Sequence, residues 1–85
     1  MAERMSILIA DDQRLFADGL RVVIESREPS FEVVGVAANG REAVEMAGEL
    51  KPHIVLMDVR MPEMDGVMAT RLIHERYPQI KVLIL

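Results

Sequence analysis

The chain has 85 residues, of which 51% are hydrophobic and 28% charged, and its formal net charge is −4 at pH 7. A chain of this length forms one small domain, and its apolar content suits a packed globule better than a disordered chain. The acidic balance argues against direct nucleic-acid binding, and the lack of cysteine excludes disulfides and thiolate metal sites. Because no apolar run approaches the ~20 residues of a membrane span and the polar start MAER lacks a signal-peptide pattern, we expect a soluble cytoplasmic domain with no membrane partner.

Two hydrophobic periodicities alternate along the chain. Short apolar runs rich in β-branched residues predict strands buried on both faces, and segments with apolar residues on one stripe predict helices. In chain order these are a strand at 6–10, a helix at 13–27, a strand at 31–38, a helix at 39–51, a strand at 53–57, a helix at 66–76 and a strand at 81–85. The order βαβαβαβ with short links predicts an α/β fold, in which helices cover both faces of a parallel sheet.

The apolar stripes also indicate which side of each helix is buried. The residues expected to face inward are Phe16, Leu20, Val23 and Ile24 in the first helix, Ala43, Ala47 and Leu50 in the second, and Ala69, Leu72 and Ile73 in the third. We expect Asn39 to cap the second helix, with Glu42 three residues on in a pattern close to a capping box. Asp12 is expected to help start the first helix.

Acidic residues follow two of the predicted strands, where apolar runs stop. Asp11 and Asp12 come directly after the first strand, and Asp58 comes after the third. In an open α/β sheet the ligand site lies beyond the carboxyl ends of the strands, so neighbouring first and third strands would bring these carboxylates into one pocket. Three like charges repel at that range, and a hard divalent cation such as Mg²⁺ relieves the repulsion while leaving room for phosphate oxygens. Helix caps and loop positions explain one or two such acids, but not three.

The segments ILIADDQ and IVLMDVRMPEMDG resemble the receiver domain of two-component response regulators. DDQ after the first strand and VRMPEMDGVMATRLI after the third are most similar to the LuxR/NarL-type branch, which carries a helix-turn-helix output domain. The resemblance covers residues 6–85 and implies a flavodoxin-like (CheY-like) sheet, here truncated to βαβαβαβ with strand order 2-1-3-4. It implies that residues 1–85 are the N-terminal part of a receiver domain, and that the DNA-binding output domain is not present.

The resemblance implies a role for each residue of the acidic pocket. Asp58 would be the phosphoacceptor, receiving a phosphoryl group from a sensor histidine kinase or a small phosphodonor. Asp12 would bind Mg²⁺ directly, Asp11 through water, and the backbone carbonyl of Arg60 would be a further ligand. Pro62 and Gly66 would shape the loop, and Gly66 would let the third helix approach closely because it has no Cβ. Such a domain is a signalling module rather than a metabolic enzyme, and it would reach DNA only through its output domain.

The family pattern also requires a Thr or Ser after the fourth strand and a Lys after the fifth, and neither falls within the 85 residues. We therefore expect the natural protein to continue past Leu85. In the family order a fifth strand covers the fourth, so the segment VLIL would be an exposed edge beside an uncovered apolar sheet face. The expected consequence is self-association through the fourth strand, the sheet face or a swapped element.

Two alternatives to a phosphorylated receiver stay open at this point. A truncated receiver could act only as an oligomerising or interaction module, without phospho-switching. A phosphatase of the haloacid dehalogenase type would also place a nucleophilic Asp after a strand. That family needs a second Asp two residues later, where this chain has Arg60, so this alternative is strongly disfavoured.

Overall fold

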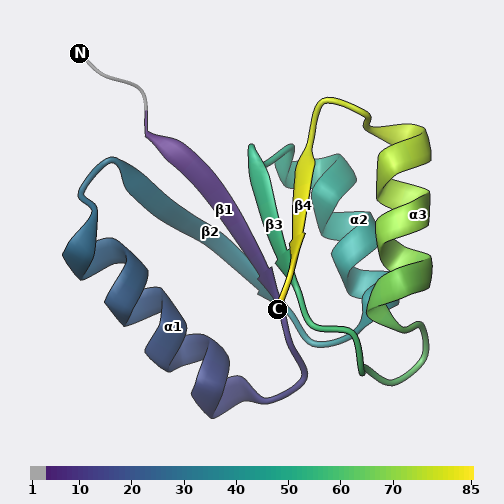
Figure 1. Cartoon of the computed structure of the whole chain (residues 1–85), viewed down its shortest axis with the longest axis horizontal. Coiled ribbons are helices and arrows are strands. Elements are labelled where there is room, and N and C mark those ends of the chain that lie inside the picture. The colour runs from purple at the N-terminus through teal and green to yellow at the C-terminus, as the bar shows by residue number, and fades with distance from the viewer. Residues whose placement is uncertain (1–3) are drawn as a thin grey trace.

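A computed structural model describes residues 4–85, which form a four-stranded parallel sheet between helices (Figure 1). The elements in chain order are β1 (Met5–Ala10), α1 (Arg14–Arg27), β2 (Phe31–Ala37), α2 (Gly40–Leu50), β3 (Ile54–Met57), α3 (Gly66–Arg76) and β4 (Lys81–Ile84). The α/β prediction is confirmed, and the predicted elements match the observed ones to within about two residues at each end. None of the described helices is long and apolar enough to cross a bilayer.

The strand order is β2-β1-β3-β4, as the family resemblance implied. Strands β1 and β3 pair directly in parallel, with Ala10 opposite Met57 as the last partners of the ladder. The β1–β2 ladder contains a register shift between Ile7 and Leu8, and there the Val33 N–H donates to the Glu25 carboxylate of α1 (2.9 Å). Glu25 thus satisfies a backbone donor that the irregular ladder leaves free.

Helices lie on both faces of the sheet, and each face has its own apolar cluster. Helices α2 and α3 pack together on one face, and α1 lies on the other face beside β1 and β2 (Figure 1). Small side chains mark the closest helix positions: Ala17, Ala43, Ala47 and Ala69 are fully buried. Alanine at these positions allows each helix backbone to lie near the strands.

The predicted inner stripe of α1 is only half right. Leu20 and Ile24 pack against the sheet as expected, but Phe16 and Val23 are 49% and 52% exposed. The buried centre of the stripe is Ala17, so the contact line runs through Ala17, Leu20 and Ile24. Phe16 and Val23 lie at its edge. Leu50 at the end of α2 is also more exposed than predicted.

Two of the three helices begin with a side-chain cap. Asn39 accepts a hydrogen bond from the Glu42 N–H (2.8 Å), which confirms its predicted role, and the Glu42 carboxylate accepts from the N–H of Ala38. Asp65 caps α3 by accepting from the Met68 N–H (2.9 Å). The prediction that Asp12 starts α1 is wrong, since the capping position is Gln13 and no side chain caps it.

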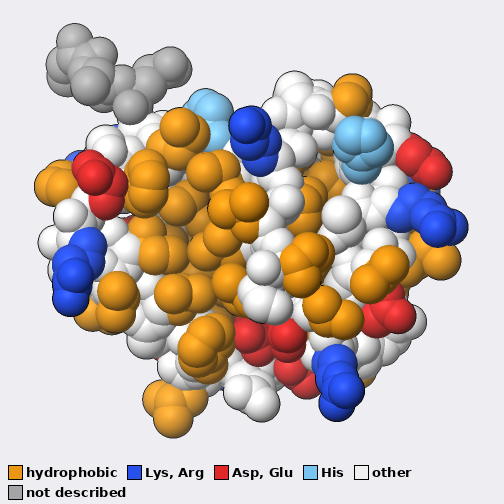
Figure 2. Space-filling model, in the orientation of Figure 1, with side chains coloured by type: hydrophobic (Ala, Val, Ile, Leu, Met, Phe, Trp, Pro, Cys, Tyr) orange, Lys and Arg blue, Asp and Glu red, His pale blue; other side chains and the backbone are white. Residues whose placement is uncertain are grey.

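Apolar side chains gather over the sheet beside α1, as Figure 2 shows. At the edge of the sheet, the β4 residues Leu83 and Ile84 are 53% and 51% exposed, and Leu85 is 50% exposed. The expected exposed apolar edge is therefore present in the structure.

Gly19 offers a test of how exposed the outer side of α1 is. It lies inside the helix, and no other part of the chain comes within 4 Å of the place where a Cβ would stand. Gly19→Ala should therefore raise the free energy of unfolding in urea by about 0.5–1 kcal/mol, because alanine loses less backbone entropy. Gly40→Ala is the matched contrast: its Cβ would collide with the Met64 carbonyl, so that variant should be less stable. A Gly19→Ala protein no more stable than the parent would contradict this view of α1.

Candidate functional site

Three carboxylates meet at the carboxyl end of the sheet, and they come from two neighbouring strands. The β1–β3 ladder ends at Ala10 and Met57, so Asp11 and Asp58 leave the sheet side by side. Backbone hydrogen bonds hold both positions: the Asp11 N–H donates to the Ala37 carbonyl and the Asp58 N–H to the Ala10 carbonyl, each at 2.9 Å. Asp11 is therefore tied to β2, and Asp58 to β1, before either side chain is considered.

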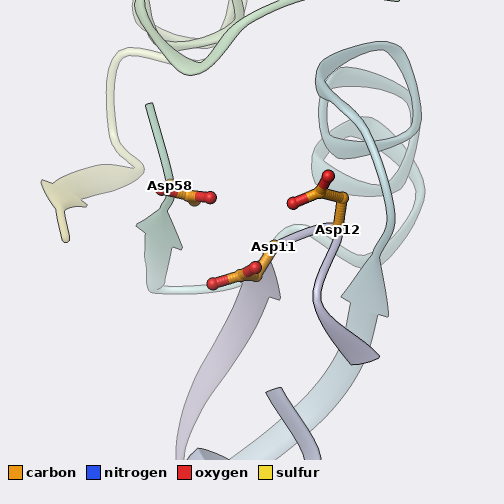
Figure 3. Close-up of side chains that lie close together, drawn as sticks. All are labelled: Asp11, Asp12 and Asp58. Atoms are coloured by element: carbon orange, nitrogen blue, oxygen red, sulfur yellow. The ribbon is translucent and has the colours of Figure 1, made fainter. Parts of the chain in front are cut away.

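The side chains of Asp11, Asp12 and Asp58 offer carboxylate oxygens that all lie within 4.8 Å of one another. Figure 3 shows Asp58 and Asp12 pointing toward one another, with Asp11 beside them. Asp11 is only 5% exposed, and one of its oxygens accepts the Gln13 N–H (2.9 Å). Asp12 faces this group instead of the start of α1, which explains why it does not cap the helix.

The donor set fits a hard divalent cation. It consists of carboxylate oxygens only, and the described residues place no cation of their own in hydrogen-bonding contact with them. Like charges this close raise the free energy of the site, and a bound Mg²⁺ would offset them while keeping several water or phosphate ligands. A cavity of ≈ 570 Å³ opens beside the carboxylates, and its remaining walls come from Gln13, Phe16, Val59, Arg60 and Leu85.

Gly66 fixes the distance between α3 and the loop that follows Asp58. A Cβ on Gly66 would collide with the Asp58 carbonyl oxygen and lie 2.9 Å from Val59 Cα. The Gly66 N–H donates to the Val59 carbonyl (2.7 Å), so the start of the helix rests on the backbone of the site. The predicted close approach of the third helix is thus observed at this residue.

The loop between Asp58 and α3 also contacts the start of α2, and the sequence gives no sign of this contact. The Glu63 carboxylate accepts hydrogen bonds from the Asn39 amide (2.9 Å) and the Arg41 guanidinium (3.3 Å). These partners are 24 and 22 residues away in the sequence, so no local pattern could have revealed them.

The family model of the response regulator receiver domain matches residues 7–85. The chain belongs to the response regulator receiver family. The transcriptional regulatory protein DegU of Brevibacillus brevis is 43% identical over 82 residues, which are 96% of this chain and 34% of that protein. A protein-glutamate methylesterase/protein-glutamine glutaminase of Shewanella denitrificans is 45% identical over 74 residues, 87% of this chain and 19% of that enzyme.

Among solved structures, a LuxR-family two-component response regulator from Aurantimonas sp. SI85-9A1 superposes with a TM-score of 0.90 at 35% identity, covering 96% of this chain and 58% of that one. The predicted family and fold are therefore confirmed. The alternative of a phosphatase of the haloacid dehalogenase type is not supported. The chain spans about a third of the length of DegU and a fifth of the methylesterase. Receiver domains accordingly occur in proteins whose remaining parts differ.

The contact at Gly66 predicts a measurable cost of adding one methyl group. Gly66→Ala should lower the free energy of unfolding by about 1–3 kcal/mol, because the collision is with backbone that has little room to move. The amide NMR signals of Asp58 and Val59 should shift as the loop is pushed away. Gly19→Ala is the control, since it adds the same methyl group in open space. Unperturbed amides in Gly66→Ala would disprove the close contact.

Proposed function

We propose that this receiver domain accepts a phosphoryl group on Asp58 in a Mg²⁺-dependent reaction, as part of a two-component signalling protein. The observation that carries the proposal is the group of three carboxylates within 4.8 Å of one another, beside an open cavity at the carboxyl end of the sheet. Asp58 has room on its cavity side for an incoming phosphorus atom. It follows the central strand β3, so the sheet holds the nucleophile in place.

The residues around the pocket would divide the metal site between them. Asp12 binds Mg²⁺ directly, Asp11 through water, and Asp58 and the backbone carbonyl of Arg60 provide the remaining protein oxygens. When bound, Mg²⁺ offsets negative charge on the phosphoryl oxygens. Asp11 suits an indirect role because it is buried and already accepts one backbone N–H.

The transfer is a single displacement at phosphorus. A carboxylate oxygen of Asp58 forms the new P–O bond, and the P–N bond to a histidine imidazole of the sensor kinase breaks. The electron pair of that bond stays on the imidazole nitrogen, which the solvent then protonates. The product is an acyl phosphate on Asp58, and the chain acts as a phosphoacceptor rather than as a metabolic enzyme.

The output that this domain would control is the DNA-binding part of a transcription factor. The similarity to DegU and to a LuxR-family regulator supports that output over an enzymatic one, although the similarity to a methylesterase shows that part of an enzyme can also resemble this chain. We place this receiver domain in the cytoplasm. The alternative of a module used only for interaction is not favoured, because it leaves the clustered acids without a role.

Acyl phosphate formation is tested by intact-protein mass spectrometry. Incubation with acetyl phosphate and Mg²⁺ should add about 80 Da, the mass of one phosphoryl group. Asp58→Asn should remove the adduct, because the amide is a poor nucleophile, while Asp65→Asn should retain it as a control for an acid outside the cluster. An adduct that persists in Asp58→Asn would rule out this residue as the acceptor.

The metal assignment has a separate test. Asp12→Ala should abolish Mg²⁺ binding measured by isothermal titration calorimetry, because it removes the direct carboxylate ligand. Asp18→Ala, on the outer side of α1, should bind as the parent does. Unchanged affinity in Asp12→Ala would refute the assignment.

We also propose that the chain associates with itself through β4 or the apolar sheet face beside it. Leu83 in the edge strand β4 and Leu85 just after it have half-exposed side chains, and both support this contact.

Light scattering at micromolar concentration should give the mass of a dimer or larger assembly, and Leu83→Lys should shift it to the monomer. Leu15→Lys is the control, since that leucine is 88% exposed but belongs to α1 and not to β4. A monomer mass for the parent chain would exclude the proposal.

A further inference from the structure

Glu63 has a backbone conformation that an L-residue rarely adopts. Its φ is 66°, and the Met64 N–H donates to the Pro62 carbonyl across it (2.7 Å), which closes a three-residue turn. A side chain with a Cβ is strained in this left-handed region, so other contacts must hold the turn in place.

The contacts that hold it reach from the Glu63 carboxylate to the start of α2. One oxygen accepts from the Asn39 side-chain amide (2.9 Å), and the other accepts from Arg41 Nε (3.3 Å). Asn39 is 6% exposed, and its own oxygen caps α2, so both ends of its amide are fixed. The hydrogen bond and charge of Glu63 raise the pKa of Arg41 above its ordinary value.

The hydrogen bonds of the Glu63 carboxylate connect the two segments that flank the acidic pocket. On one side, the Ala37 carbonyl at the end of β2 holds the Asp11 N–H, and Asn39 follows two residues later. On the other side, the turn leads into Gly66, whose N–H holds the Val59 carbonyl next to Asp58. The turn is also packed directly on α2, since a Cβ on Gly40 would collide with the Met64 carbonyl.

We propose that Glu63 is a positioning residue, which holds the loop after Asp58 in the conformation that presents the Arg60 carbonyl to the metal. This inference rests on the Mg²⁺ site proposed above. Glu63 itself touches neither the metal nor the phosphoryl group. The Asn39 bond is the main contribution, because the Arg41 pair is about half exposed and an exposed ion pair contributes little.

Glu63→Gly separates positioning from simple stability. Glycine adopts a φ of 66° without strain, so this variant keeps the turn available while it removes the carboxylate. We expect its Mg²⁺ dissociation constant to rise about tenfold, as happens when a side chain that holds a metal ligand in place is lost. Glu63→Gln keeps one oxygen for the Asn39 amide and should lie in between.

Glu45→Gln is the matched control. It removes the other carboxylate bound to Arg41 (3.0 Å) but does not touch the loop, so Mg²⁺ affinity should stay at the parent value. An independent readout is hydrogen exchange at the Gly66 amide in the absence of metal, which should become faster in Glu63→Gly but not in Glu45→Gln.

The Mg²⁺ affinities and exchange rates of these variants decide whether Glu63 positions the loop. Parent-like Mg²⁺ affinity together with parent-like exchange in Glu63→Gly would overturn it, and so would equal losses in Glu45→Gln. If the parent chain itself binds no Mg²⁺, the proposed function fails, and the exchange rate of the Gly66 amide alone then decides whether Glu63 holds the loop.

Discussion

The parallel pairing of β1 with β3 is the constraint on which the site depends. Because the ladder runs in register to Ala10 and Met57, the next residues of both strands must emerge together. Both of those residues are aspartates, and a third follows, so the fold itself brings like charges together. Nothing in the described part of the chain neutralises them by an ion pair. The sheet therefore holds an electrostatically unfavourable arrangement that a cation would relieve.

Two close backbone contacts lie at this edge of the sheet. Gly40 and Gly66 begin α2 and α3, and a Cβ on either would collide with backbone of the loop between β3 and α3. Gly19, far from the site on the outer side of α1, has no such neighbour. The missing side chain therefore matters for the position of the loop at Gly40 and Gly66, but not at Gly19.

Much of this architecture could be predicted from the sequence, because its signals are local. The buried strands read as apolar runs, and the cap at Asn39 lies three residues from its partner. The position of Phe16 could not be predicted in the same way, since it depends on how α1 rotates against the sheet around Ala17. Glu63 was missed for a stronger reason: its partners are distant in sequence, and a glutamate gives no sign of a left-handed backbone.

The ligands proposed for Mg²⁺ differ in how firmly the fold holds them. Asp11 and Asp58 directly follow paired strands, and their N–H groups continue the sheet's hydrogen bonding. The carbonyl of Arg60 comes two residues later, in a loop without regular structure. The ladder does not determine where that carbonyl points. Its position depends on contacts farther along the loop. Met61 and Met64 pack against the core, the Gly66 N–H donates to the Val59 carbonyl, and the Glu63 carboxylate accepts hydrogen bonds from the start of α2. The Glu63 carboxylate thereby helps to position the Arg60 carbonyl, although Glu63 lies outside the pocket.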